Sequence, residues 1–162
     1  MWSPDRRGLL AALTAAAALT GCGFAPVYAP GATGSGLTGR VRIAPPAETN
    51  GFNLVARLED RLGRPQGAVY DLAWTVTTDT VESAVAPDGA LLRYTLTGRA
   101  DYTLTALADG AQIAAGQVQG MTAWSATGST VASLAAEDDA AARLMVILAD
   151  RIVARLLAVP LP

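Results

Sequence analysis

The sequence contains no lysine and no histidine, and it has a single cysteine among 162 residues. Without lysine there is no Walker-type phosphate loop and no Schiff base. Without histidine there is no Ser-His-Asp or Cys-His nucleophile pair and no imidazole ligand for a metal. One cysteine cannot form an internal disulfide. An enzyme built from this sequence remains possible only through carboxylates, serines or tyrosines.

Charge of either sign is also scarce. Only 16% of the residues are charged, and the 12 arginines and 14 acidic residues give a formal net charge of −2. A nonspecific nucleic-acid-binding protein needs a basic surface, so the sequence disfavours nucleic acid as a partner. The hydrophobic content of 51% is ample for a buried core.

The single cysteine, Cys22, ends the run Leu-Thr-Gly-Cys at residues 19–22. It follows Arg6, Arg7 and the apolar stretch from Leu9 to Leu19. A charged start, a short apolar run and small residues at the cleavage site are typical of a secretory signal peptide. The run is too short to span a bilayer, which needs about 20 apolar residues. Leu-Thr-Gly-Cys also resembles the bacterial lipobox, in which the cysteine thiol is acylated and becomes the mature N-terminus.

We therefore expect a covalent lipid on Cys22 and no other cofactor. The alternative is an ordinary signal peptide that carries this cysteine by chance. A single acyl chain binds membranes only marginally, but bacterial lipoproteins usually carry three, so the anchor should be permanent. In typical Gram-negative bacteria an Asp after the cysteine retains a lipoprotein in the inner membrane, whereas this chain has Gly23. The sequence thus predicts a lipid-anchored protein on the periplasmic side of the outer membrane. Residues 6–10 partly match a twin-arginine signal, so Sec and Tat export both stay open.

Composition divides the chain into three parts. Residues 1–21 form the signal peptide, residues 22–39 a lipidated tether, and residues 40–162 one domain of ordinary size. Cleavage removes two basic residues and one acidic residue, which leaves a net charge near −3. The G-x-G-x-x-G pattern at 34–39 follows a Pro- and Gly-rich stretch rather than a strand, so we interpret it as tether and not as a dinucleotide site.

A short strand over residues 40–44 and a helix from Thr49 or Asn50 to residue 62 are predicted to open the domain. The helix should end at Gly63. Its charged residues are expected to be solvated. The residues expected on its buried face are spaced i, i+3, i+6 and i+10: Phe52, Val55, Leu58 and Leu62.

Alternation of apolar and polar residues predicts three more strands, over residues 70–77, 93–104 and 113–125. The chain is expected to turn at residues 87–89 and to form a two-residue hairpin at Asp109-Gly110. Within the last of these strands, Gly116 and Gly120 suggest a bulge or a close approach of another backbone.

The last predicted element is a long helix from Val131 or Ser133 to Leu157. Its apolar stripe is spaced i, i+4, i+8 and i+12 and is expected to pack against the sheet: Leu144, Leu148, Ile152 and Leu156. The acidic run 137–139 near its start and the arginines near its end complement the helix dipole. Consecutive helical side chains point about 100° apart, so these acids do not converge on one metal ion.

The element order is β-α-β-β-β-α. It predicts an α+β fold in which two helices pack on one face of a mostly antiparallel sheet.

Several segments of the chain together resemble the LPS-assembly lipoprotein (LptE) family. The sharpest is residues 22–28, which read C-G-F-A-P-V-Y where the family often has C-G-F-x-P-[LV]-Y. The first helix, the strand start Tyr70-Asp71-Leu72, the strand segment 93–96 and the closing helix over residues 132–152 also fit. The likeness covers nearly all of the chain after the signal peptide.

The resemblance implies two helices on a four-stranded sheet and a non-enzymatic role. It implies a lipoprotein that plugs and helps to assemble a large outer-membrane β-barrel, the LptD-type translocon, which inserts lipopolysaccharide into the outer leaflet. The implied partners are that barrel and lipopolysaccharide. Barrel interiors of this size are polar. The candidate barrel contacts therefore lie on a polar strand face and at a loop tip: Thr95, Thr97, Asp88 and Gly89.

Family members are said to bind lipopolysaccharide through basic residues, often lysines, and this chain offers only arginines. Arg93 and Arg99 lie six residues apart, share one strand face and should be about 20 Å from each other. Arg40 and Arg42 share a face of the first strand and would extend the patch if that strand is adjacent. The alternative is that these are ordinary surface arginines paired with acids such as Asp101.

Two other functions stay open from the sequence. The first is an accessory lipoprotein of an ABC-type lipid transport system, which would have a partner at the inner membrane or across the periplasm. The second is a lipid-anchored hydrolase that uses carboxylates such as Asp138 and Asp139.

Overall fold

The computed structural model describes residues 26, 28–29, 31–85, 91–126 and 129–161. Cys22 and the predicted turn at 87–89 lie outside the described residues. Seven elements follow one another along the described chain: α2 (Thr33–Leu37), β1 (Val41–Ile43), α3 (Thr49–Leu62), β2 (Tyr70–Val85), β3 (Leu91–Ala106), β4 (Gln112–Ser125) and α4 (Thr130–Leu157).

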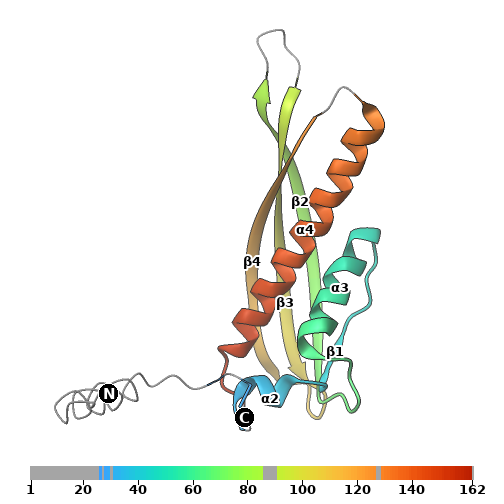
Figure 1. Cartoon of the computed structure of the whole chain (residues 1–162). Coiled ribbons are helices and arrows are strands. Elements are labelled where there is room, and N and C mark those ends of the chain that lie inside the picture. The colour runs from blue at the N-terminus through green and yellow to red at the C-terminus, as the bar shows by residue number, and fades with distance from the viewer. Residues whose placement is uncertain (1–25, 27, 30, 86–90, 127–128, 162) are drawn as a thin grey trace, which may run out of the picture.

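The four strands form one sheet in the order β1-β2-β3-β4. β1 runs parallel to β2, and the β2–β3 and β3–β4 pairs are antiparallel. The long helices α3 and α4 both lie on one face of this sheet, and β2 and β3 extend beyond α3 at one end of the molecule (Figure 1). The predicted α+β fold, with two helices on one face of a four-stranded and mostly antiparallel sheet, is confirmed.

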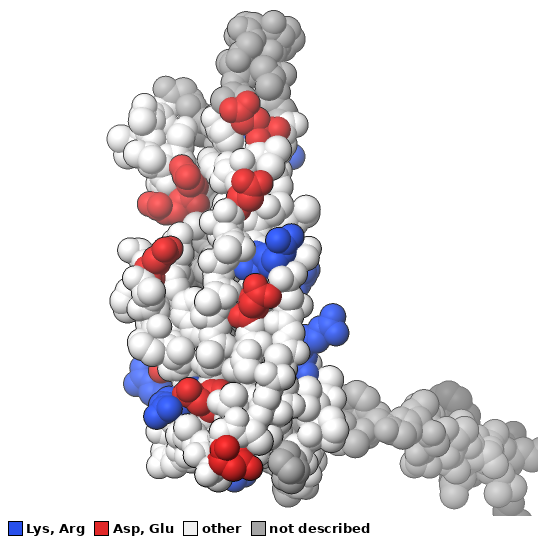
Figure 2. Space-filling view, turned by 180° about the vertical axis from the view of Figure 1, so that it is seen from behind, with Lys and Arg blue, Asp and Glu red and all other residues white. Residues whose placement is uncertain are grey.

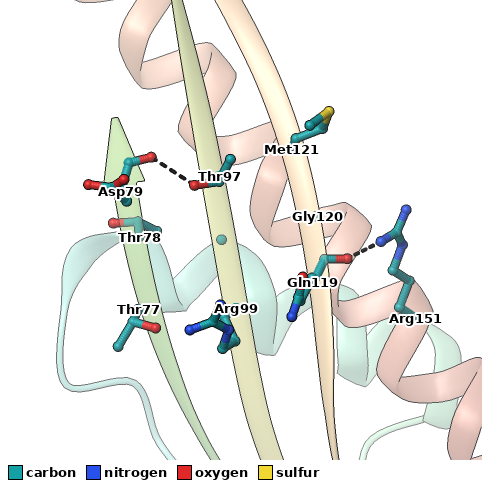
Figure 3. Close-up of a pocket in the computed structure, with 10 residues that line it drawn as sticks. Thr77, Thr78, Asp79, Thr97, Arg99, Gln119, Gly120, Met121 and Arg151 are labelled. Carbon is teal, nitrogen blue, oxygen red and sulfur yellow. Dashed lines mark hydrogen bonds between the residues drawn. The ribbon is translucent and has the colours of Figure 1, made fainter. Parts of the chain in front are cut away.

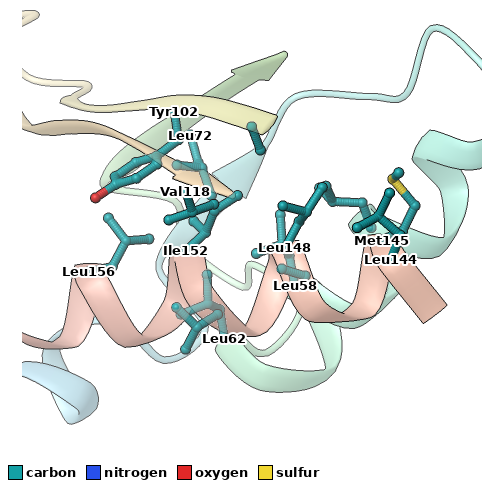
Figure 4. Close-up of a cluster of buried hydrophobic side chains, with 14 of the residues drawn as sticks. Leu58, Leu62, Leu72, Tyr102, Val118, Leu144, Met145, Leu148, Ile152 and Leu156 are labelled. Carbon is teal, nitrogen blue, oxygen red and sulfur yellow. The ribbon is translucent and has the colours of Figure 1, made fainter. Parts of the chain in front are cut away.

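The core lies between the sheet and the two long helices (Figure 4). The predicted alternation of β2 and β3 is confirmed, since even-numbered residues such as Leu72, Ala100 and Leu104 point into the core while the odd-numbered residues of both strands face outward. The predicted stripe of α4 is fully buried: Leu144, Leu148, Ile152 and Leu156.

Small residues in the sheet let α4 approach the strands closely. Gly98 of β3 and Gly120 of β4 are direct cross-strand partners, and a Cβ atom on either would lie within 3.1 Å of a Leu144 side-chain atom. The bulge or close backbone approach predicted at Gly120 is not found, because the atoms nearest to this glycine belong to side chains of α4. At Gly116 the neighbour is the Tyr102 ring, and the irregularity in the β3–β4 pairing lies elsewhere, between Leu104 and Thr105.

The buried face of α3 is rotated from the predicted one. Phe52 is 64% exposed, whereas Leu54, which was not predicted to be buried, is fully buried beside Leu58 and Leu62. The buried positions therefore run i, i+4 and i+8 from Leu54, and the sequence pattern alone was compatible with either phase of the helix. The N-cap is Glu48 rather than Thr49 or Asn50, and its side chain makes no capping hydrogen bond.

The packed part of the chain begins earlier than residue 40. The segment 33–37, which its composition assigned to the tether, forms α2, and Leu37 is fully buried in the core. The Gly39 N–H donates to the Leu62 carbonyl over 2.7 Å, which ties this segment to the end of α3. The glycines of the G-x-G-x-x-G pattern did not prevent a helical turn because Leu37 supplies an apolar anchor at its end.

Two local predictions need correction. The β3–β4 connection is the five-residue segment 107–111, in which the Ala106 N–H donates to the Ala111 carbonyl over 2.8 Å and only Gly110 has a positive φ, of 73°. A two-residue type I′ turn needs positive φ at both central residues, so Asp109-Gly110 is not one. In α4 the first turn holds no acidic residue, because the helix begins at Thr130 and the run 137–139 lies two turns further along.

Candidate functional site

The face of the sheet opposite the helices is not covered by any helix or strand of the described chain. The odd-numbered residues of β2, β3 and β4 point out from this face, and most of them are Thr, Gln, Asp or Arg. Figure 2 shows this side of the molecule, with isolated basic and acidic groups on a mainly uncharged surface and no continuous basic patch. This open face is therefore polar and of mixed charge.

A hollow of about 550 Å³ lies near the middle of the open face. Figure 3 shows side chains from β2, β3 and β4 around it, with Arg151 of α4 reaching over the far side of β4. The Thr97 hydroxyl donates to the Asp79 carbonyl over 3.2 Å. The residues that give the hollow its hydrogen-bonding and charged groups are Thr77, Thr78, Asp79, Thr97, Arg99, Gln119 and Arg151.

The structure brings only part of the predicted site together. Thr97 and Arg99 line the hollow, and Thr95 and Arg93 continue along the same face of β3 beyond it. The Thr95 and Ser83 hydroxyls are hydrogen-bonded to each other across the β2–β3 pair. Arg93 and Arg99 are both exposed, with six residues of extended strand, or about 20 Å, between them. Asp88 and Gly89 lie outside the described residues.

Arg40 and Arg42 do not join Arg99, which corrects the proposed extension of the patch. β1 pairs with β2, so β2 lies between β1 and β3. Arg42 of β1 is opposite Asp71 of β2, and Asp71 is in turn opposite Thr105 of β3. Thr105 lies six residues from Arg99 along β3, or about 20 Å.

Both arginines also have other contacts. The Arg42 Nε donates to the Asp71 carboxylate over 2.8 Å, and this hydrogen bond raises the pKa of Arg42 above its ordinary value, as does the attraction between the charges. The Arg40 guanidinium lies 5.9 Å from the centre of the Tyr70 ring.

Two arginines of α4 contact the edge of the sheet and were not predicted as part of any site. Arg151 donates to the Gln119 carbonyl, and Arg143 donates to the Ala123 carbonyl over 3.2 Å. The sequence assigned the C-terminal arginines of this helix only to the helix dipole. Their reach across the edge of β4 depends on how α4 lies on the sheet, so no local pattern could have shown it.

The charged residues between α3 and α4 are also not merely solvated. Arg57 of α3 holds Asp150 of α4 with two hydrogen bonds, of 3.0 Å from Nε and 3.1 Å from Nη2. Arg61 adds a third bond to the same carboxylate over 3.2 Å. The bond to Asp150 raises the pKa of Arg57, although partial burial opposes the rise. These bonds join the two helices at the side away from the sheet.

Neither a metal centre nor a membrane-spanning helix is found in the part of the chain that the structure describes. Within it, no three acidic, cysteine or histidine side chains gather closely enough to hold a metal ion. Its helices also lack the combination of length and apolar character that crossing a bilayer requires.

Comparison with known proteins identifies the family. A sequence model of the LptE family, described as lipopolysaccharide-assembly, matches residues 38–156. This range begins just before β1 and ends in the last turn of α4, so it covers the whole sheet and both long helices. No curated protein matches the sequence.

Solved structures show the same fold at low sequence identity. A putative lipoprotein from Caulobacter crescentus CB15 is similar with a TM-score of 0.65 and 22% identity, over 77% of this chain and 92% of that one. Rare lipoprotein B from Shewanella oneidensis is similar with a TM-score of 0.55 and 13% identity, over 72% and 91% of the two chains. A minor lipoprotein from Acinetobacter baumannii is similar with a TM-score of 0.54 and 14% identity, over 76% of this chain and 97% of that one. The family match extends over well more than half of the sequence, and this protein therefore belongs to the LptE family of lipopolysaccharide-assembly proteins.

Proposed function

We propose that this protein is a lipid-anchored outer-membrane lipoprotein that binds inside an LptD-type β-barrel, helps the barrel to assemble and assists the insertion of lipopolysaccharide into the outer leaflet. The observation that carries the proposal is the LptE family match over residues 38–156, which spans the complete sheet and both long helices. The anchor is a lipid on Cys22, which places the domain on the periplasmic side, and the protein uses no other cofactor.

The open face of the sheet supports a position inside a barrel. The interior of a large outer-membrane barrel is polar, so a domain within it has to present polar groups. Thr95 and Thr97 lie on this face, and neither contributes to the core. We assign these two threonines, with Asp88 and Gly89 at the predicted β2–β3 turn, as barrel contacts.

Arg99 is the best-placed residue for a contact with lipopolysaccharide. A guanidinium pairs with phosphate through two parallel, charge-assisted hydrogen bonds, and lipopolysaccharide carries phosphates. Arg99 is exposed, lines the hollow with Arg151 and has no ion-pair partner within the described part of the chain. Arg93 is placed to bind a second anionic group of the same large glycolipid. Arg42 is a weaker candidate, because Asp71 already neutralises it.

Site-specific photocrosslinking in living cells tests the barrel interface. A photoreactive amino acid at Thr95 or Thr97 should capture a heat-modifiable protein of barrel size, and mass spectrometry should identify that protein as the LptD-type barrel. The matched control is Ala56, an exposed position on α3 that lies on the helical side of the sheet. Strong crosslinks to the barrel from Ala56 with none from Thr95 and Thr97 would show that the interface has been assigned to the wrong face. Capture of an ABC transporter subunit at these positions would disprove the proposed partner.

Binding measurements across a salt series test the lipid contact. The Arg93→Ala/Arg99→Ala variant should bind purified lipopolysaccharide more weakly and with a shallower salt dependence, because fewer charge-assisted contacts to phosphate remain. The control is Arg64→Ala, which removes an arginine whose side chain is 87% exposed, at the end of α3. Unchanged affinity and an unchanged salt slope in the double variant would remove both arginines from the site.

A further inference from the structure

The two long edges of the sheet differ in whether their backbone groups are free. At the β4 edge, the odd-numbered residues point their N–H and C=O groups away from β3. The arginines of α4 occupy two of the outward carbonyls, those of Gln119 and Ala123. Arg143 and Arg151 lie eight residues apart, which is about 12 Å along a helix. The two carbonyls lie four residues apart, which is about 13 Å along a strand. The spacing of the guanidinium groups therefore matches the spacing of the carbonyls that they cap.

The opposite edge is open over most of its length. β1 has only three residues, and its last pair with β2 is Ile43 with Leu72. The Leu72 carbonyl accepts from the Ala44 N–H over 2.9 Å, so the even-numbered residues of β2 point their backbone groups toward this edge. From Val76 to Glu82 these groups have no backbone partner within the described part of the chain. That stretch is about 20 Å long.

The surroundings of the open edge indicate what it can bind. A groove of about 230 Å³ separates Val76 and Thr78 from the segment that leads into α3. Three acidic residues lie on or beside the edge, namely Glu48, Asp79 and Glu82, and among the described residues none of them forms an ion pair. In Figure 2, acidic groups predominate in the upper half of the molecule, while most basic groups lie lower.

We propose that the edge of β2 from Val76 to Glu82 accepts an extended, basic polypeptide segment of a partner protein as an additional strand. Backbone hydrogen bonds to the even-numbered residues would supply the affinity, as in other cases of strand addition, and the three carboxylates would select for lysine or arginine. An unprotected strand edge of this length promotes uncontrolled pairing, and proteins commonly block such edges. In this chain two arginines of α4 cap carbonyls of the β4 edge, whereas no such cap is found on the β2 edge from Val76 to Glu82 among the described residues, and this difference favours an incoming strand at the β2 edge.

Hydrogen exchange of the full chain in detergent, with synthetic peptides as probes, tests this inference. The first probe is an eight-residue peptide in which lysine alternates with valine, and the second has glutamate in place of lysine. Both are N-methylated on alternate residues, so each can pair along one edge only and cannot stack on itself. The lysine peptide should slow exchange at the amides of Val76, Thr78 and Thr80 at least tenfold. It should leave the outward β4 amides of Gln119 and Met121 unchanged, and the glutamate peptide should protect neither set.

Two variants separate strand pairing from simple charge attraction. Thr78→Pro removes one outward N–H and leaves the hydrogen bonds to β3 intact, so protection should be lost while the circular dichroism spectrum is kept. If this variant does not fold, Thr78→Lys/Thr80→Lys serves instead, because two lysines at the edge repel a basic strand. Arg143→Gln/Arg151→Gln should extend protection to the β4 amides.

Three results would overturn the inference. They are no protection at the β2 edge, equal protection at both edges of the unaltered protein, and full protection in the folded Thr78→Pro or Thr78→Lys/Thr80→Lys variant. Equal protection by both peptides would overturn the assignment of a basic partner. None of these outcomes depends on the barrel, so the proposed function is tested separately.

Discussion

Substitution of Gly98 by alanine tests the packing of α4 on the sheet. A Cβ atom at this position would lie 2.8 Å from Leu144 Cδ2, 3.1 Å from Leu144 Cγ and 3.2 Å from Leu148 Cδ1. Both leucines are fully buried, so neither can move away from the added methyl group without displacing its neighbours. Overpacking of this kind costs about 1–3 kcal/mol.

The lower entropy of the unfolded chain opposes this overpacking cost but is smaller. Alanine has less conformational freedom than glycine in the unfolded chain, which stabilises the folded state by about 0.4–1 kcal/mol where the backbone conformation permits. We therefore expect Gly98→Ala to lower the free energy of unfolding by about 1–2 kcal/mol. For a domain of this size, the thermal midpoint should fall by roughly 3–5 °C per kcal/mol.

Thermal unfolding followed by circular dichroism measures this change. The control is Gly67→Ala, at an exposed position where an added Cβ meets no atom within 4 Å, and its stability should stay within about 0.5 kcal/mol of the unaltered protein. Combining Gly98→Ala with Leu144→Ala tests the cause. Once the leucine side chain is gone, the added methyl group fills part of the cavity, so its cost should fall to zero or change sign.

Two results would refute the reasoning. If Gly98→Ala is as stable as the unaltered protein, α4 does not press on β3 as closely as the structure shows. If the cost of Gly98→Ala is the same with and without Leu144, the destabilisation has another source than this contact.

Four further measurements test other parts of the structure. Leu148→Ala removes a fully buried side chain and should cost about 2–5 kcal/mol in chemical or thermal unfolding, and a cost below 1 kcal/mol would contradict its central place in the core. Cys22→Ser should release the protein into the aqueous phase of a detergent partition without lowering its thermal midpoint, and a large loss of stability would show that the domain depends on its anchor. Asp150→Asn should lower the thermal midpoint by loosening α3 from α4, whereas Glu59→Gln should not, because it affects only one ion pair, with the highly exposed Arg64, that does not join the two helices. Burial raises the pKa of Tyr102 above its ordinary value of 10, so the unfolded chain loses this proton first and stability should fall as the pH rises above about 10; Tyr102→Phe should flatten that slope, and an unchanged slope would assign it to other groups.

Much of the fold follows from local patterns in the sequence. The alternation in the middle strands and the i, i+4 stripe of α4 each specify which face of an element is apolar, and such faces have to be buried against one another. The family was recognisable for the same reason, together with the C-G-F-A-P-V-Y segment at residues 22–28. The lack of lysine and histidine by itself removes imidazole and amine chemistry from the possible functions.

Local patterns were insufficient where two interpretations were equally good. Phe52 and Leu54 both fit an apolar stripe on α3, and the surface offered by α4 and β1 decided that Leu54 is buried. Leu37 stands in a glycine-rich segment that resembles a linker, and it is buried because the neighbouring Gly39 N–H bonds to the end of α3.

Within the candidate site, sequence alone determined that Arg93, Thr95, Thr97 and Arg99 share one face, because side chains alternate strictly along a strand. Only the tertiary structure decided which residues join them. β2 keeps Arg42 away from Arg99, and α4 brings Arg151 across the edge of β4. The short β1 also leaves the β2 edge free. Strand order and helix placement depend on contacts between residues that are distant in sequence, so no local repeat encodes them.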